Sequence, residues 1–353
     1  MKKTAVVLLL SILIISCKSA QISKNNFFTS VKIDTIFTDK ISIRAIAIDD
    51  DKVYFAGNKS RVGYIRLEKL NNKINQALVY DTIDYEYRSI AVNSKAVFAL
   101  NVGNPARLCK FPKNLINDKV IVYQEHNEKV FYDSMQFWND NEGIAIGDPI
   151  DNCFSIIITR DGGATWQKLP CEKLPKLVDG EAAFAASNTN IIVKGNSTWL
   201  VSGGKKARVF FSPDKGITWM VYDSPIVQGA TMTGIFTADF YNEKIGFVAG
   251  GNYEKPNQNF QNKALTTDGG KTWKLVGENK GFGYASCVQF VPDSNAKQLV
   301  SVGASGLFYS KDQGKTWLQL SADSTLYTIR FINDFTAIAA GKDKIVKLVF
   351  SAE

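Results

Sequence analysis

The stretch TRDGGATW at residues 159–166 recurs three times further along the chain. It returns as SPDKGITW at 212–219, as TTDGGKTW at 266–273 and as SKDQGKTW at 310–317, so the shared pattern is Ser/Thr-x-Asp-x-Gly-x-Thr-Trp. The copies begin at residues 159, 212, 266 and 310, which gives spacings of 53, 54 and 44 residues. That period is too long for one coil of a solenoid and suits a four-stranded unit of ~40 to 50 residues. We therefore expect each copy to mark one blade of a β-propeller.

The residues around each copy predict a β-hairpin. A β-branched or aromatic run such as SIIIT or RVFFS precedes the motif, and its Trp begins a second run. The Asp and the leading Ser or Thr can accept hydrogen bonds from turn amides, and Gly supplies the positive φ that such a turn needs. Each Trp has a large apolar surface to bury against the hairpin. We interpret the Asp and Trp of the four copies as structural residues: Asp161, Trp166, Asp214, Trp219, Asp268, Trp273, Asp312 and Trp317.

A second repeated element extends the pattern to parts of the chain that lack the motif. It consists of a strand-like run, a short turn and a second run ending in Gly, and its copies lie at 42–57, 87–103, 132–147 and 181–204 and begin again near 234, 286 and 327. Seven copies predict an all-β fold over residues 27–353, a single seven-bladed β-propeller of four-stranded antiparallel blades. The last copy offers only three strands. We expect residues 31–37 (VKIDTIF) to complete that blade and close the ring.

Composition and charge exclude several classes of function. The 42 Lys and Arg residues outnumber the 34 Asp and Glu residues, but they are spread singly, which indicates a solvated basic surface rather than a nucleic-acid site. The single His, His126, has no recognisable catalytic or metal-binding partner. No Gly-x-Gly-x-x-Gly follows a strand into a helix. We expect a monomer without metal or cofactor.

The N-terminus is typical of an exported protein. An apolar run at 5–15 follows two lysines, which matches a signal peptide and is too short to span a membrane. The run ends in Ile-Ile-Ser-Cys and resembles the bacterial lipobox. That resemblance implies a lipoprotein signal peptide at 1–16, lipidation of Cys17, a polar tether at 17–26 and an outer-membrane lipoprotein that faces the periplasm or the cell surface. An ordinary secretory signal cut near Ala20 is the alternative.

Four further cysteines remain after Cys17. None of them lies in a Cys-x-x-Cys spacing, which argues against a zinc or thiol-redox site. Cys153 and Cys171 flank the hairpin of the first motif almost symmetrically, so they could face each other across it. A disulfide between them is possible in an oxidising compartment. Two buried free thiols are the alternative.

A polar-ligand site is expected at the mouth of the central channel. The innermost strands line this channel, and four of the seven begin with a charged residue: Arg44, Arg88, Asp133 and Glu181. The loops after the second strands place more Arg and Tyr residues on the same face. The candidate ligand-binding residues are Arg44, Arg61, Arg88, Arg107, Arg208, Tyr253 and Tyr327. In the alternative interpretation, opposite charges only pair with one another across the mouth.

Three carboxylates on that face are the candidate catalytic residues if the protein is an enzyme. Hydrolysis of a glycoside requires two carboxyl groups separated by roughly 5 to 9.5 Å. Asp133, Asp148 and Glu181 come from two adjacent repeats on the same face. The sequence leaves open whether they converge.

The repeated motif resembles the Asp box, or BNR repeat, of sialidases and related β-propellers. In those families the box is a turn remote from the active site, so the resemblance implies a fold and not a reaction. The early Arg-Ile-Pro motif of sialidases is absent, because SIRAIA at 42–47 lacks the Pro. Similar bacterial propellers are often labelled oxidoreductase or glycosyl hydrolase.

The order of several phrases resembles a bacterial family of secreted propellers whose relatives include the photosystem II stability and assembly factors. The phrases are NPAR, GIAIGDP, GEAAFAAS, ARVF and GG-x-Y. This resemblance implies binding of a protein partner or assembly intermediate through an Arg-rich face. The first two repeats depart from it, since YIRLEKL and LCKFPKN contain no Asp box. Asp-box xyloglucan-degrading glycosidases are also similar, but they join two propellers.

Two functional hypotheses follow. The first is a lipid-anchored binding or assembly module for a protein partner or a glycan. The second is a glycoside hydrolase that uses the carboxylates at the channel mouth.

Overall fold

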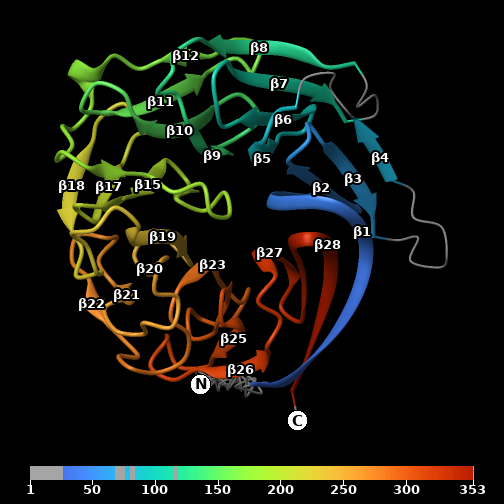
Figure 1. The fold of residues 1–353 in the computed structure, drawn as a ribbon, viewed down its shortest axis with the longest axis vertical. Helices are drawn as coiled ribbons and strands as arrows, with labels where there is room; N and C mark the ends of the chain where they lie inside the picture. Colours follow the sequence, from blue (N-terminus) through green and yellow to red (C-terminus); the bar gives the residue numbers. More distant parts are fainter. Residues whose placement is uncertain (1–26, 68–75, 80–83, 114–117, 353) are drawn as a thin grey trace, which may run out of the picture.

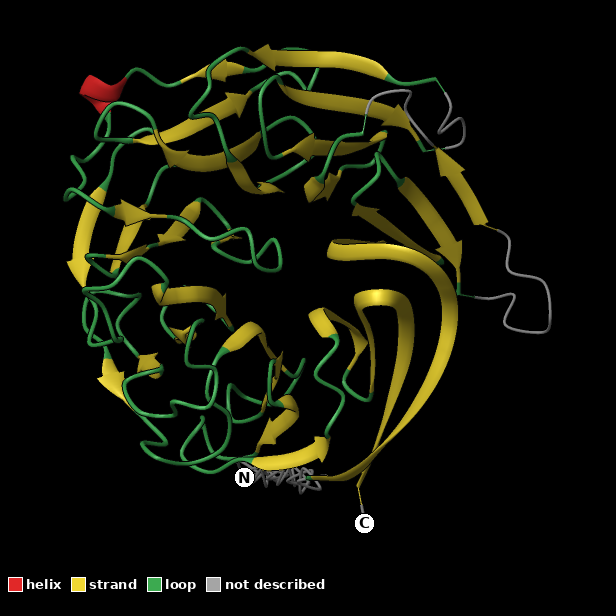
Figure 2. Cartoon of the chain, viewed as in Figure 1, coloured by secondary structure: helices red, strands yellow, loops and turns green. Residues whose placement is uncertain are grey.

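The computed structural model describes residues 27–67, 76–79, 84–113 and 118–352. These residues form β-sheets that stand around a common centre, and the two ends of the described chain lie side by side (Figure 1). Strands dominate the ring, and the 3-10 turn η1 (Cys171–Lys173) is its helical element (Figure 2). No helix in this part of the chain is long and apolar enough to cross a membrane. The expected all-β propeller architecture is confirmed.

Four of the sheets contain four antiparallel strands each. The first is formed by β5 (Tyr87–Val92), β6 (Ala96–Asn101), β7 (Ala106–Pro112) and β8 (Val120–Glu125). The second is formed by β9 (Tyr132–Phe137), β10 (Gly143–Pro149), β11 (Phe154–Thr159) and β12 (Gln167–Lys168). The third contains β14 (Ile191–Lys194), β15 (Ser197–Val201), β17 (Arg208–Ser212) and β18 (Met220–Asp223). The fourth contains β23 (Ala285–Phe290), β24 (Leu299–Gly303), β25 (Gly306–Ser310) and β26 (Leu318–Ser321).

The other two sheets contain six strands each. One has the order β27 (Leu326–Asn333), β28 (Thr336–Ala352), β1 (Phe28–Asp49), β2 (Lys52–Gly57), β3 (Val62–Arg66) and β4 (Gln76–Val79). The other has the order β13 (Glu181–Ala182), β16 (Gly203–Gly204), β19 (Thr233–Phe240), β20 (Gly246–Asn252), β21 (Lys263–Thr266) and β22 (Lys274–Leu275).

The prediction of seven blades is wrong, because the described strands form six sheets. The first and last repeats share one sheet through β1, which has 22 residues. Its first part pairs with β28 and its second part pairs with β2. No Gly or Pro lies within β1 to end the strand between the two repeats. The repeat at 181–204 is also divided, since β13 and β16 join the sheet of β19 while β14 and β15 belong to another sheet.

The N-terminal strand closes the ring. Residues 31–37 pair with β28 in the register Val31↔Phe350, Ile33↔Leu348 and Phe37↔Ile345. The ring of Phe28 stacks on that of Phe350, with centroids 4.7 Å apart. The pairing expected between residues 31–37 and the C-terminal strand is therefore present, and it satisfies a sheet edge that would otherwise be open.

Each repeated turn is held by its own Asp. Oδ1 of Asp161 accepts hydrogen bonds from the backbone N–H groups of Ala164 and Thr165 at 2.9 and 3.0 Å, and Oδ2 accepts one from the Thr165 hydroxyl at 2.6 Å. Burial raises the pKa of Asp161, but these bonds and one from Thr159 outweigh it and lower the pKa to about 2. The same hydroxyl bond recurs in the other three turns at Asp214, Asp268 and Asp312.

Apolar side chains fill the spaces between neighbouring sheets. Trp199 of β15 is fully buried and stacks on Phe240 of β19, with ring centroids 3.9 Å apart. The Trp of an Asp box can reach the preceding sheet, as Trp166 does in its edge contact with Phe98 of β6 at 6.2 Å. The boxes therefore stabilise contacts between blades as well as single turns.

Candidate functional site

A single loop fills the centre of the ring. The central loop, residues 183–190 (AFAASNTN), forms hydrogen bonds with the innermost strands β1, β5, β9, β19, β23 and β27. The Asn188 side chain joins two of these strands, because its Nδ2 donates to the carbonyl of Ile90 at 2.9 Å and its Oδ1 accepts from the N–H of Met135 at 2.9 Å. The Nη2 of Arg330 donates to the carbonyls of Ser187 and Asn188 in the loop, at 3.2 and 3.3 Å. The central loop thus separates the two ends of the channel.

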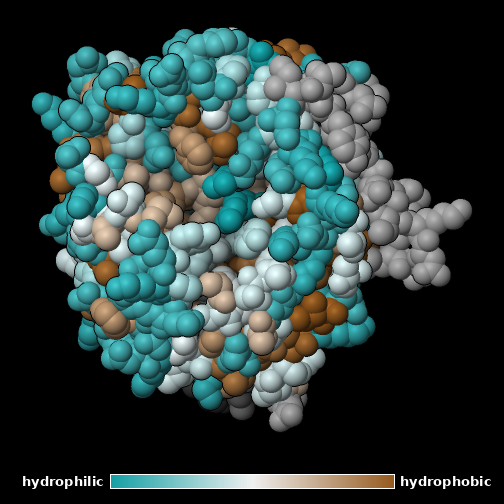
Figure 3. All heavy atoms as spheres, in the orientation of Figure 1, coloured by the Kyte–Doolittle hydropathy of each residue, from teal (hydrophilic) through white to brown (hydrophobic). Residues whose placement is uncertain are grey.

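The innermost strands begin on one face of the ring, termed here the entry face. Arg88 and Asp133 lie at the starts of β5 and β9, and Arg44 lies at the start of the part of β1 that pairs with β2. At the other end of the channel is a hollow of about 300 Å³, which is lined by the later residues of β1, β5, β9 and β27 and by Asn188 of the central loop. On the face shown in Figure 3, strongly hydrophilic residues lie near the centre, next to a group of more apolar ones.

Arg44 carries a positive charge that no carboxylate of the described residues offsets. Its Nη1 donates to the carbonyl of Ala186 at 3.2 Å, and its guanidinium lies 4.3 Å from the ring centre of Tyr327. Within the described residues it forms no salt bridge. Arg88, by contrast, donates from Nε to the partly exposed carboxylate of Glu86 at 2.7 Å. Arg44 therefore has guanidinium donors left for a ligand.

A group of packed aromatic side chains lies beside these arginines. Phe184 of the central loop stacks on Phe236 with ring centroids 3.9 Å apart, and Tyr284 contacts Phe236 edge-on at 4.8 Å. Burial raises the pKa of Tyr284 to about 12, and Arg44 and Arg88 are close enough to oppose that rise. Tyr253 packs edge-on against Tyr284 at 5.1 Å while 47% of its surface is exposed. Arg44, Arg88, Tyr253, Tyr284 and Tyr327 are termed the mouth cluster below.

Glu181 is fully engaged by its neighbours. Arg208 donates to both of its carboxylate oxygens, Ser202 donates to Oε1 at 2.6 Å and the N–H of Val178 donates to Oε2 at 3.1 Å. The side chain of Glu181 has no exposed surface. For Glu181 and Arg208, charges pair with each other, and neither offers a free group to a ligand.

Asp133 and Asp148 form a second acidic position on the entry face. The N–H of Asp148 donates to the carbonyl of Phe131 at 2.7 Å, which brings the end of β10 beside the start of β9. Asp133 is fully buried, and among the described residues neither of its carboxylate oxygens has a hydrogen-bond partner. Burial, and then the charge of Asp148, raise the pKa of Asp133 well above its usual value.

Asp148 connects this acidic position to the central loop. Its Oδ1 accepts a hydrogen bond from the N–H of Ala183, the first residue of that loop, at 2.9 Å. Burial raises the pKa of Asp148 to about 6, although the Ala183 bond opposes the rise. Asp148 also lines a hollow of about 440 Å³ between residues 148–152 and 177–182, termed here the acidic groove.

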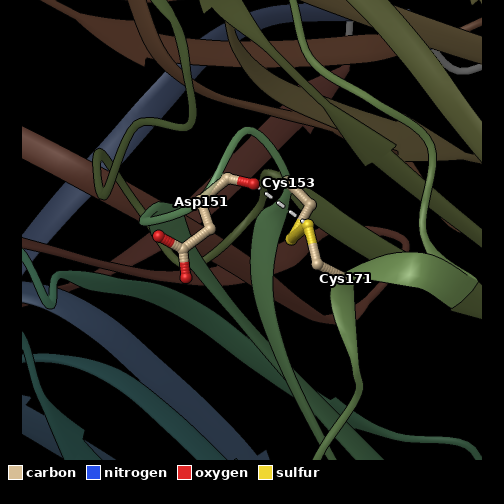
Figure 4. Close-up of a disulfide and its surroundings, with 3 residues drawn as sticks. All are labelled: Asp151, Cys153 and Cys171. Atoms are coloured by element: carbon tan, nitrogen blue, oxygen red, sulfur yellow. Dashed lines mark hydrogen bonds between the residues drawn. A yellow bond between two sulfur atoms is a disulfide. The ribbon is translucent and has the colours of Figure 1, made fainter.

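A disulfide holds the two sides of the acidic groove together. Cys153 and Cys171 are bonded, with Cα atoms 5.7 Å apart, and Cys171 Sγ lies 3.1 Å from the carbonyl oxygen of Asp151 (Figure 4). Nearby, the N–H of Leu177 donates to the carbonyl of Asn152 at 2.9 Å. Cys109 and Cys287 are buried.

The structure brings together only part of the predicted ligand-binding set. Arg44, Arg88, Tyr253 and Tyr327 belong to the mouth cluster. Arg61 instead forms a salt bridge with Asp39, Arg107 donates to Gln124 at 3.1 Å, and Arg208 binds Glu181. Cys17 lies outside the described residues. Sequence reasoning missed Phe184, Phe236 and Tyr284, whose only signal was an aromatic residue in each segment that leads into a strand near the channel.

Comparisons with known proteins agree with this architecture. Residues 308–317 match the family model of the BNR/Asp-box repeat. No curated protein sequence matches the chain. Among solved structures, the chain is similar to YCF48 bound to D1 peptide, with a TM-score of 0.63 and 15% identity over 92% of this chain and 98% of that chain.

Two other structures are similar to a comparable degree. YCF48 from Cyanidioschyzon merolae has a TM-score of 0.61 and 12% identity, over 91% of this chain and 98% of that one. The WD40 β-propeller domain of Doa1 also has a TM-score of 0.61 and 12% identity, over 92% and 98%. At these identities the likeness shows the fold alone. The chain is a β-propeller that carries BNR/Asp-box repeats.

Proposed function

We propose that this BNR-type β-propeller is a binding or assembly module that holds a peptide segment of a protein partner at the mouth cluster. The observation that carries the proposal is Arg44, whose guanidinium lies over Tyr327 on the entry face and has no carboxylate partner in the described ranges of the chain. A YCF48 structure similar to this chain has a D1 peptide bound, which supports a peptide as the ligand class.

The chemistry of the mouth cluster suits such a segment. A guanidinium binds a carboxylate with two parallel hydrogen bonds, and it keeps its charge at every physiological pH. Tyr253 offers an exposed ring that Tyr284 holds from behind, so little side-chain freedom is lost when a partner covers it. We therefore expect the bound segment to place an acidic group at Arg44 and an apolar group on Tyr253.

The arrangement gives less support to a glycoside hydrolase. Such an enzyme needs two carboxyl groups that both reach the substrate. Glu181 is held by Arg208 and has no exposed side-chain surface, and Asp133 is fully buried. Of the three candidate acids, Asp148 alone retains partial access to solvent at the acidic groove. A binding role without turnover is the function that this geometry favours.

Selection of ligands from a displayed library of random peptides tests this proposal. The wild-type chain is expected to enrich peptides that combine an acidic residue with a neighbouring apolar one. Arg44→Gln should lose the acidic preference, because Gln removes the charge while keeping a polar side chain of similar length. Tyr253→Ala should reduce enrichment of the apolar residue. Absence of any enriched peptide, together with binding of a glycan panel, would contradict the proposal.

We further propose that the chain is exported and held at a membrane by a lipid on Cys17. The support is the signal-like run at 5–15 and the lipobox-like Ile-Ile-Ser-Cys that ends it. Cys17→Ser is expected to move the protein from the membrane fraction to the soluble fraction after cell lysis. Cys109→Ser, which changes a buried cysteine of the propeller, should leave fractionation unchanged. Retention of the Cys17→Ser chain in the membrane fraction would refute the anchor.

A further inference from the structure

We infer that the acidic groove is a second subsite, in which Asp148, backed by Asp133, binds the basic side chain of a lysine or arginine on the same partner. This inference rests on the proposed function, because it adds a cation-binding position on the same entry face as the anion-binding Arg44. The mouth cluster would then be selective for a segment that carries charges of both signs.

The strongest support is the state of Asp133. Its side chain is fully buried, yet neither carboxylate oxygen has a hydrogen-bond partner in the part of the chain that the structure describes. A buried carboxyl group without partners is costly, and proteins keep such groups where another molecule completes the site. Asp133 interacts electrostatically with Asp148, so a cation bound at Asp148 would reduce the repulsion between the two carboxylates.

Two of the protein's own cations near this pair are engaged by other carboxylates. Arg88 is the nearby cation that favours the charged form of Asp133, but its Nε donates to Glu86. Arg208 is bound to Glu181 on both carboxylate oxygens. The exposed carboxylate of Asp179 lies on the same groove, with the exposed Lys129 at its side. The groove therefore retains negative charge that a basic side chain would complement.

The donor set favours an ammonium or guanidinium group over a metal ion. Among the described residues, no group of three or more His, Cys, Asp or Glu side chains is placed to hold a metal. The Oδ1 of Asp148 already accepts one hydrogen bond from Ala183, which leaves its other lone pairs for N–H donors. A hollow of about 440 Å³ has room for one long side chain.

The disulfide and the loop geometry make the groove a built feature of the fold. Cys153–Cys171 joins the segment after Asp148 to the segment before Glu181. The hydrogen bond from the Ala183 N–H fixes the position of the Asp148 carboxylate. Because these contacts are made within the chain itself, the groove is preorganised, and binding a side chain there requires little rearrangement.

Small model compounds test the subsite without any peptide. The probes are Nα-acetyl-lysine methylamide and Nα-acetyl-arginine methylamide, with Nα-acetyl-glutamine methylamide as the neutral control and Ca²⁺ as the metal control. The readout is the amide resonance of Ala183 in transverse-relaxation-optimised NMR spectra of the deuterated wild-type chain. We expect the two cationic probes to shift this resonance with saturation in the millimolar range, and the neutral probe to leave it unchanged.

Three variants make the result specific. Asp148→Asn keeps an oxygen acceptor for the Ala183 N–H but removes the charge, so it should weaken the cationic probes at least tenfold. Asp293→Asn makes the same charge change at an exposed position on another blade and should have no effect. Arg160→Gln removes a positive charge at an Asp-box turn outside the groove lining, and it should leave probe binding unchanged.

The outcomes separate this inference from the proposed function. Probe binding that depends on Asp148 supports the subsite even if no peptide is enriched in the selection. A shift caused by Ca²⁺ at lower concentration than by either amine would replace the inference with a metal site. If neither cationic probe shifts the resonance while Asp148→Asn folds normally, the carboxyl pair has no ligand of this class and the inference is wrong.

Discussion

A chain that begins at Asp39 is expected to lose most of its folding stability compared with one that begins at Phe27. The shorter chain lacks the part of β1 that pairs with β28 from Phe28 to Thr38. It therefore lacks three buried side chains, Phe28, Ile36 and Phe37, each of which is at most 5% exposed in the full fold. The apolar side chains that pack against these three become exposed to water. Burial of each such side chain contributes about 1.5 to 3 kcal/mol, so the loss is on the order of 5 to 9 kcal/mol before the broken hydrogen bonds are considered.

That loss is comparable with the whole stability of an ordinary domain, which is about 5 to 15 kcal/mol. Urea unfolding followed by Trp fluorescence gives the comparison directly. Lys32→Ala is the matched control, because Lys32 lies on the same strand with its side chain 73% exposed and should change the unfolding midpoint little. Equal midpoints for the chains starting at 27 and 39 would mean that β1 does not close the ring.

Asn188→Ala is expected to destabilise the protein by about 3 to 5 kcal/mol. The change removes the acceptor for the Met135 N–H and the donor to the Ile90 carbonyl, and both partners lie in buried strands. Each buried polar group left without a partner costs about 1 to 3 kcal/mol. Asn188 also has a φ of 59°, a conformation that Asn tolerates better than Ala.

Asn190 offers a matched control two residues away in the same loop. It is equally buried, but neither side-chain amide atom has a hydrogen-bond partner among the described residues. Asn190→Ala should therefore leave the free energy of unfolding unchanged within about 1 kcal/mol or raise it, because it removes polar atoms that the fold does not satisfy. Urea unfolding of both variants checks the pair. A larger loss for Asn190→Ala than for Asn188→Ala would contradict the role given to the central loop.

Local features of the fold could be predicted because short-range chemistry determines them. The Asp161 turn satisfies its own amides, so the motif alone specifies a hairpin. The alternation in VKIDTIF indicated a strand, and the shortage of one strand at the C-terminus indicated its partner. The predicted number of blades was wrong because repeats in the sequence do not show whether one strand continues from one repeat into the next. Strand β1 continues across two repeats without a break.

The site was less predictable because it depends on the central loop. Its sequence, AFAASNTN, was assigned to a loosely formed strand pair, and nothing local indicates that Asn188 would bond to strands about 50 and 100 residues earlier. Arg44 and Arg88 were identified from their position at strand beginnings, which the ring geometry relates to the mouth. That same reasoning could not distinguish Arg44 from Arg208, because the pairing of Arg208 with Glu181 depends on side-chain geometry.

The most direct test of the proposed binding role is a calorimetric titration of the best selected acidic peptide into three forms of the chain. The forms are wild type, Arg44→Gln and Arg160→Gln. Arg160 is the matched control, because it is also a partly exposed arginine but lies next to Asp161 in an Asp box, where it binds Glu142.

Loss of one charge-assisted contact at Arg44 should weaken binding at least tenfold, which corresponds to about 1.4 kcal/mol. Arg160→Gln should leave the dissociation constant unchanged. Equal affinity of all three forms, or a loss confined to Arg160→Gln, would contradict the assignment of the ligand site to the mouth cluster.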